Sequence, residues 1–111
     1  MMSESSDGGR KKIWGKIIRE NMVRVNGSQS IYRLNEKKNR SVEILLSPRN
    51  LPVLPQRHGQ LPKVQLPVGQ RNVTLDVSRA DFLILNKEQT AMKQTQYIPW
   101  NKIAEIVVRD E

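Results

Sequence analysis

Hydrophobic and polar residues alternate in several short stretches of this chain, a period of two that is typical of β-strands with one buried face. The clearest stretches are residues 41–46, 73–77 and 104–109. Residues 82–85 are apolar on both faces, so they are predicted to form a central strand. A further short strand is predicted over residues 96–98, immediately before a proline.

The segment that follows the first nine residues fits two kinds of element. Trp14, Ile18 and Met22 recur every four residues, which suits a helix, whereas the apolar residues around Gly15 alternate, which suits a strand. A glycine inside a helix costs about 1 kcal/mol relative to alanine. We therefore favour a strand, bent at Gly15 or Asn21.

A β-hairpin is predicted next, because Asn26 and Gly27 both tolerate the positive φ that a type I′ turn requires. The turn lies between the strand-like residues 22–25 and 30–34. A second, fully polar turn over residues 35–40 leads into the next alternating strand. The first half of the chain is thus expected to be a three-stranded antiparallel meander.

Residues 47–70 interrupt this pattern, because they contain five of the six prolines, four of them preceded by leucine. Proline removes a donor from a strand ladder and makes the preceding residue extended. We expect a long extended excursion with a short edge strand over residues 63–66. Its leucines are expected either to cover the open end of the fold or to dock on a partner, as in Pro-x-x-Pro ligands. The residues assigned to partner binding are Leu51, Pro52, Leu54 and Pro55.

These segments amount to six to eight short strands without a long helix. The expected fold class is all-β, a small antiparallel barrel or sandwich with a long proline-rich loop. Residues 86–96 are polar and are expected to form a loop or one weak helical turn. Residues 1–9 are small and polar and are predicted to be a disordered tail, which leaves residues 10–111 as a single small β-domain.

The stretch Tyr97-Ile98-Pro99-Trp100-Asn101-Lys102-Ile103-Ala104-Glu105-Ile106-Val107-Val108 resembles the end of an Sm-like small β-barrel. In that family, a short strand with an Ile-Pro or Val-Pro step is followed by a tight turn and a closing strand. The resemblance implies a small barrel and ring-forming oligomers. It carries no binding residues over to this chain.

Positive charge is concentrated in one region of the chain. The whole chain has a formal net charge of +8, but residues 10–72 carry 14 basic and 3 acidic side chains, a net of +11. Residues 73–111, with 5 basic and 6 acidic side chains, are close to neutral. A basic region of this kind favours an anionic partner, such as nucleic acid or an acidic protein.

Catalysis is not expected. The absence of cysteine excludes thiolate chemistry and disulfides, and the single histidine, His58, lies in a polar loop without an evident orienting partner. Neither a glycine-rich phosphate loop nor a Gly-x-Ser-x-Gly elbow is present. We predict a non-enzymatic binding module without cofactor or bound metal.

The favoured function is binding of RNA or DNA through phosphates, without sequence readout. Trp14 is the one aromatic residue inside the basic run, so it is the candidate for stacking on bases, although packing in the core explains it as well. Phe82 is expected in the core, with Tyr97 and Trp100 as its caps. The candidate nucleic-acid contacts are Arg10, Lys11, Lys12, Trp14, Lys16, Arg19, Arg24, Arg33, Lys37, Lys38 and Arg40.

The alternative function is that of a protein-interaction or assembly subunit, which uses the Leu-Pro segment and exposed edge strands and forms a homo-oligomer. The N-terminus is polar and acidic, unlike a signal peptide, and no apolar run approaches the ~20 residues of a membrane helix. We therefore expect a soluble, cytoplasmic protein without a transmembrane segment.

Overall fold

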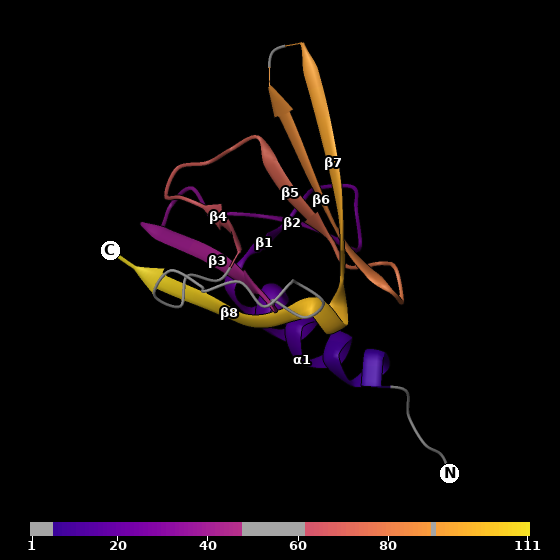
Figure 1. Cartoon of the computed structure of the whole chain (residues 1–111). Coiled ribbons are helices and arrows are strands. Elements are labelled where there is room, and N and C mark those ends of the chain that lie inside the picture. Colours follow the sequence, from indigo (N-terminus) through magenta and orange to yellow (C-terminus); the bar gives the residue numbers. More distant parts are fainter. Residues whose placement is uncertain (1–5, 48–61, 90) are drawn as a thin grey trace.

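The computed structural model describes residues 6–47, 62–89 and 91–111. These residues form eight strands in two antiparallel sheets, one α-helix and one 3-10 turn (Figure 1). The prediction of a small all-β fold is confirmed. Within the described residues the strand ladders do not close into a barrel.

The first sheet has five strands in the order β1-β2-β5-β6-β7, and the second has three in the order β4-β3-β8. The strands of the first sheet are β1 (Val23–Arg24), β2 (Ile31–Arg33), β5 (Val73–Asp76), β6 (Phe82–Gln89) and β7 (Met92–Pro99). Those of the second are β3 (Arg40–Leu46), β4 (Lys63–Leu66) and β8 (Ile103–Asp110). The chain therefore passes between the two sheets three times.

The hydrophobic core lies between the inner faces of the two sheets. Alternation places Val42 and Ile44 of β3 inward, and Leu75 and Leu83 of the first sheet are also fully buried. Trp100, which is 0% exposed, begins the turn η1 (Trp100–Lys102) between β7 and β8. Its indole Nε1 donates a hydrogen bond of 3.1 Å to the carbonyl oxygen of Arg79, so its polar atom is satisfied inside the core.

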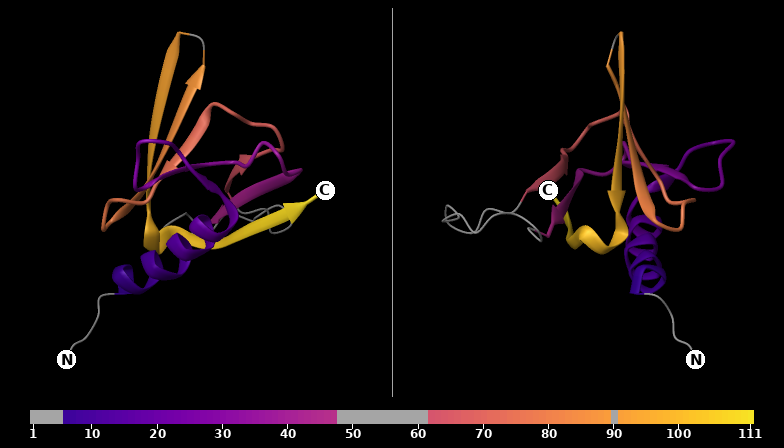
Figure 2. Two further views of the ribbon diagram at one scale, coloured as in Figure 1. Left: turned by 180° about the vertical axis from the view of Figure 1, so that it is seen from behind. Right: turned by 45° about the vertical axis from the view of Figure 1, so that its right-hand side comes forward.

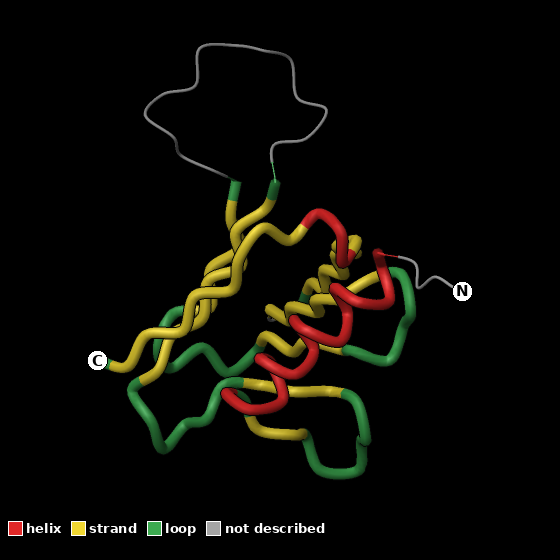
Figure 3. The backbone as a smooth tube through the Cα atoms, turned by 90° about the horizontal axis from the view of Figure 1, so that it is seen from below, coloured by secondary structure: helices red, strands yellow, loops and turns green. Residues whose placement is uncertain are grey.

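The helix α1 (Ser6–Asn21) replaces the bent strand that we expected in this segment. Figures 1 and 3 show it below the two sheets, beside β8 and η1. The position of Ile17 decides the outcome, because a helix brings it onto the core together with Trp14, Ile18 and Met22, whereas a strand would place Ile17 on the opposite face from these three. The helix begins inside the expected tail of residues 1–9, of which residues 1–5 lie outside the described residues.

The predicted β1–β2 hairpin is present, but its connection is longer than a two-residue turn. Val25 accepts a hydrogen bond of 3.1 Å from the Ser28 amide, and Gly27 has a φ of 83°, as the turn requires. The ladder, however, pairs Arg24 with Tyr32, which leaves six residues, 25–30, between the strands.

The predicted three-stranded meander is wrong. β2 pairs with β5, and β3 crosses to the second sheet, where it pairs with β4 and β8. A polar turn specifies that the chain reverses, but it does not specify which strand becomes the neighbour. The Val73–Asp76 segment, rather than residues 40–46, becomes the neighbour of β2. Its alternating face buries Val73 and Leu75, and Leu75 pairs with the buried Tyr32.

Residues 86–96 are largely strand, which corrects the expected loop. β6 and β7 are paired from Phe82 and Pro99 outward to Gln89 and Met92. The outer part of this hairpin projects beyond the core, as Figure 1 shows, so its residues are polar on both faces and give no apolar alternation. The hydrogen-bonded ladder, rather than burial, holds this part of the hairpin together.

Several local predictions are confirmed. β4 is an edge strand, β6 is an interior strand of its sheet, and a single turn separates β7 from β8. Ile106 and Val108 lie on the inward face of β8, as the alternation of residues 104–109 predicts, but at the start of the strand Ile103 rather than Ala104 is buried. A register shift between Leu45 and Leu46 places Glu105 and then Ile103 opposite them, so Ile103 and Ile106 are buried and Ala104 is exposed.

Candidate nucleic-acid interface

Helix α1 presents positively charged side chains to solvent. Lys12, Lys16 and Arg19 are exposed, and their spacings of four and three residues place them on one face, over about 10 Å of helix length. We call these three residues the α1 basic face. Lys16 Nζ lies 3.9 Å from the Glu20 carboxylate, but both side chains are more than half exposed, so solvent screens this pair. Arg10 is also exposed on the helix.

Trp14 lies on the opposite side of α1 from this basic face. It is half-buried and packs against the hydrophobic core, in agreement with core packing, the alternative to base stacking for this residue. Its indole Nε1 is buried and has no hydrogen-bond partner among the described residues. Lys11, also half-buried, is less available to a phosphate than its exposed neighbours.

Arg24 and Arg33, which a two-residue turn at Asn26 and Gly27 would place on one face, project from opposite faces of the β1–β2 pair. The ladder sets Arg24 opposite Tyr32 and Arg33 opposite Val23, and successive strand residues alternate between faces. The six-residue connection is the reason, because it changes the register from that of a two-residue turn. Arg24 is exposed and Arg33 half-buried.

Arg33 belongs instead to a charged group around Glu36. Arg33 Nη1 lies 3.5 Å and Arg71 Nε 3.6 Å from the Glu36 carboxylate, so two arginines share one acidic side chain. Lys37 and Lys38 follow in the exposed β2–β3 loop. The Lys37 amide donates 2.9 Å to Asn35 Oδ1, which fixes the start of this loop.

Arg40 is the candidate contact with the most intramolecular partners. Its guanidinium donates from Nε and Nη2 to the two carboxylate oxygens of Asp110, at 2.5 and 2.9 Å, and from Nη1 to Asn21 Oδ1 at 3.4 Å. The hydrogen bonds with Asp110 raise the pKa of Arg40 and lower that of Asp110. This bidentate pair joins the start of β3 to the end of β8 and to α1, so Arg40 is a fold-stabilising residue rather than a free phosphate ligand.

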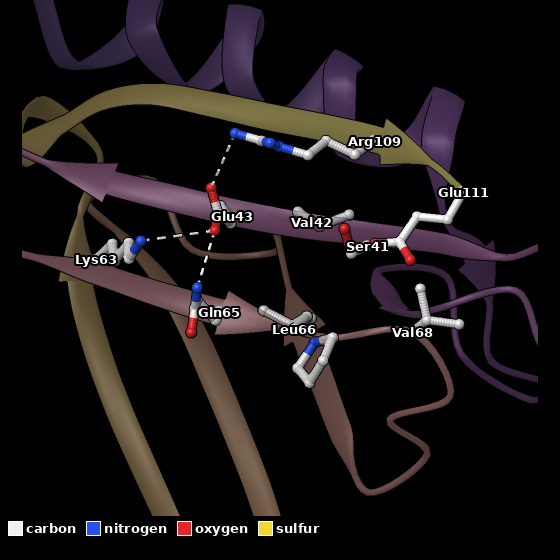
Figure 4. A pocket seen from close by; sticks show the side chains of 10 residues that line it. Ser41, Val42, Glu43, Lys63, Gln65, Leu66, Val68, Arg109 and Glu111 are labelled. Carbon is white, nitrogen blue, oxygen red and sulfur yellow. Dashed lines mark hydrogen bonds and ion pairs between the residues drawn. The ribbon is translucent and has the colours of Figure 1, made fainter.

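A second polar cluster, which the sequence did not indicate, surrounds Glu43 on the outer face of the three-stranded sheet. Gln65 Nε2 donates 2.9 Å to its carboxylate, and Lys63 Nζ and Arg109 Nη2 lie at 3.7 and 3.8 Å (Figure 4). The hydrogen bond from Gln65 is the main cause of a lowered Glu43 pKa, which burial opposes and the two cations support.

The Glu43 cluster borders a hollow of about 610 Å³, which Ser41, Pro67 and Val68 also line. Figure 4 shows Lys63, Gln65 and Arg109 directed at the Glu43 carboxylate. Both cations of the hollow are thus already paired, which makes it a poor cradle for a second anion. Only the strand register brings these residues together, so no local sequence signal could have found them.

The aromatic side chains are arranged differently from the expectation. Trp100 is in the core rather than at its cap, while Phe82 is half-buried and Tyr97 is 58% exposed. The rings of Phe82 and Tyr97 meet edge to face, with centroids 5.9 Å apart. Tyr97 is therefore an exposed aromatic residue rather than the expected cap of the core.

Some of the candidate residues lie outside the described residues. These are the partner-binding candidates Leu51, Pro52, Leu54 and Pro55, together with His58. Within the described ranges, acidic and histidine side chains do not gather into a group of three or more that could hold a metal ion. In the same ranges, no helix is both long and apolar enough to cross a membrane.

Comparison with known proteins gives no relative for this chain. No family model matches it, and neither the curated proteins nor the solved structures yield a significant match.

Proposed function

We propose that this domain binds nucleic acid through its phosphates, with the α1 basic face as the principal contact. The observation that carries the proposal is the exposure of Lys12, Lys16 and Arg19 on one face of a helix whose other side is anchored in the core. Lysine and arginine side chains held in this way neutralise phosphates without reading bases. Further exposed positive charge is carried by Arg10 of α1, Arg24 of β1, and Lys37 and Lys38 of the β2–β3 loop.

The anchoring of α1 also argues against a membrane-surface role. A helix that lies in a membrane interface inserts its apolar face. In α1 that face, which includes Trp14 and Ile18, packs against the core. The side that remains for an external partner carries Lys12, Lys16 and Arg19, with Ile13 as an exposed apolar residue among the charges, and this mainly charged surface favours a polyanion over a lipid bilayer.

Salt dependence of binding tests the proposal. Each lost phosphate contact reduces the slope of log K against log salt by about 0.9 on duplex DNA. The double variant Lys12→Gln/Lys16→Gln is expected to weaken binding to a 16-base-pair duplex and to reduce the slope by about 1.8. Fluorescence anisotropy from low to physiological salt measures both quantities.

The matched control removes the same charge elsewhere. Arg79 and Lys102 are both exposed and lie outside α1, so Arg79→Gln/Lys102→Gln also removes two positive charges. This variant is expected to retain the wild-type slope. Equal losses in the two double variants would show that net charge, rather than the α1 basic face, governs binding. A wild-type protein without measurable binding at low salt would refute the proposal.

A second candidate function is assembly into a homo-oligomer through edge strands. The observation that favours it is that β7 and β8, each eight residues long, are both outermost strands of their sheets within the described residues. The order β7, η1 and β8 also supports a relationship to the end of Sm-like barrels, for which ring formation is implied. Light scattering tests this candidate, since a mass of 12.8 kDa at every concentration would exclude it.

The Leu-Pro segment belongs to the same candidate. Deleting residues 50–60 is the appropriate test, because β4 begins at Lys63 and a longer deletion would remove a strand. Loss of oligomeric mass after this deletion would support the assembly role. Unchanged mass and unchanged partner capture would contradict a role for the segment.

A further inference from the structure

The outer face of the five-stranded sheet carries a set of side chains that the phosphate contacts on α1 do not use. The three-stranded sheet packs against the inner face of the five-stranded sheet and leaves the outer face uncovered by it (Figure 2). On that outer face, the outward residues of β5, β6 and β7 are all half-buried or exposed. The register aligns Tyr97 with Ile84 and Thr95 with Asn86 in neighbouring rows.

Tyr97 supplies an exposed aromatic ring on this face. It is 58% exposed, and Phe82 meets it edge to face at an interplanar angle of 81°. Such a contact limits the orientations of the tyrosine ring while leaving most of its surface accessible. A ring held in this way loses little conformational entropy when a flat ligand stacks on it.

A hollow of about 380 Å³ begins at Thr95, two residues before Tyr97 on the same face of β7. Its floor includes Thr74, Asn86 and Thr95, and the Thr95 hydroxyl donates 2.8 Å to Asn86 Oδ1. Amide and hydroxyl groups of this kind provide donors and acceptors for the polar edges of a nucleobase. Val25 and Ile31 also line the hollow, so it offers apolar surface to the face of a flat ligand and polar groups to its edge.

The rim of the hollow carries positive charge. Arg71 and Lys93 both line it, and Lys93 Nζ lies 3.5 Å from the Glu88 carboxylate. Arg71 shares Glu36 with Arg33, so the two arginines and one glutamate leave one positive charge uncompensated. That charge complements a phosphate, and the arginine side chain of residue 71 is 77% exposed.

We propose that this outer face binds a single-stranded nucleic acid, with one base stacked on Tyr97 and a phosphate farther along the strand held by Arg71. The inference rests on the proposed nucleic-acid binding and specifies its substrate as a strand with unpaired bases. Bases in a duplex are stacked on one another and cannot reach the tyrosine ring, whereas single-strand binding combines aromatic stacking with cationic grooves.

Two strands with the same phosphates but different bases provide the test. Binding of a twelve-residue oligouridylate is compared with binding of an abasic strand of equal length, using wild-type protein, Tyr97→Ala and Tyr97→Phe. Loss of one stacked base weakens binding by 1–3 kcal/mol, so Tyr97→Ala should lower oligouridylate affinity roughly fivefold to 150-fold. Tyr97→Phe keeps the ring and should bind as the wild type does, and all three proteins should bind the abasic strand equally.

Met92→Ala is the matched control. Met92 is on the same strand and 66% exposed, but its position in the register places it on the other face from Tyr97. This variant should leave both affinities unchanged. If Tyr97→Ala fails to fold, Tyr97→Leu, which keeps apolar volume without a ring, makes the same comparison.

Each remaining outcome has a defined meaning. Wild-type protein that binds both strands equally, or a Tyr97→Ala variant that retains full oligouridylate affinity, would overturn the inference. So would a change in oligomeric mass in Tyr97→Ala, because the face would then contact a second copy. The α1 contact is tested independently. An unchanged salt slope in Lys12→Gln/Lys16→Gln would refute the α1 contact, whereas a loss of affinity in Tyr97→Ala would still support the outer-face site.

Discussion

Replacing Gly15 with alanine tests the helical structure of the N-terminal segment directly. Gly15 lies in the interior of α1, where alanine is more favourable than glycine by about 1 kcal/mol. A Cβ atom at this position would meet only Arg19 Nη1, at 3.4 Å, among heavy atoms within 4 Å. That atom is the end of a long exposed side chain, so it can move without disturbing the core. We expect Gly15→Ala to stabilise the fold by about 1 kcal/mol.

For a chain of 111 residues, a gain of this size corresponds to a rise of about 4 °C in the melting temperature. Urea unfolding followed by tryptophan fluorescence measures the change in the free energy of unfolding, because Trp14 and Trp100 both pack in or against the core. Gly27→Ala provides a comparison of opposite sign, since the φ of 83° at Gly27 strains any residue with a side chain. A Gly15→Ala protein that is less stable than the wild type would refute the helical packing of this segment.

Two further predictions concern polar groups that the fold engages. The lowered pKa of Glu43 means that its contribution to stability is complete above the pKa of the unfolded chain, about 4.3, and is lost as pH falls through the folded value. Glu43→Gln should therefore lose less stability than the wild type between pH 7 and pH 3 in urea titrations, and equal losses would contradict the role of its hydrogen bond with Gln65. Trp100→Phe removes the buried bond to the Arg79 carbonyl and some core volume, so calorimetry should show a loss of at least about 1 kcal/mol; an unchanged melting temperature would contradict it.

Periodicity predicted the strands whose two faces differ in environment. The Val73–Asp76 strand has one fully buried face, and its alternation was unambiguous. The β6–β7 hairpin beyond the core has no buried face, so its residues carry no period and looked like a loop. The segment of α1 was predicted as a strand because its apolar residues satisfy both a period of four and local alternation. Only its packing against η1 and β8 favours the helix over the strand.

The candidate site was predictable in composition but not in arrangement. The basic region correctly indicated exposed cations such as Lys12 and Lys16. It could not reveal that Asp110, 70 residues away along the chain, engages Arg40, and it left open whether Trp14 packs in the core or stacks on bases. Tyr97 was expected to cap the core, but the register of β6 and β7 places it on the outer face of the sheet, where it is exposed.

The repeated passage of the chain between its two sheets has a consequence for how the domain folds. Neither sheet is built from one continuous segment: Tyr32 meets Leu75 in the first, and Arg40 meets Asp110 in the second. Closing such long loops costs conformational entropy before the stabilising contacts form. We therefore expect folding in milliseconds to seconds, as for other folds dominated by non-local contacts. We expect a single cooperative transition, in which neither half of the chain acquires structure without the other.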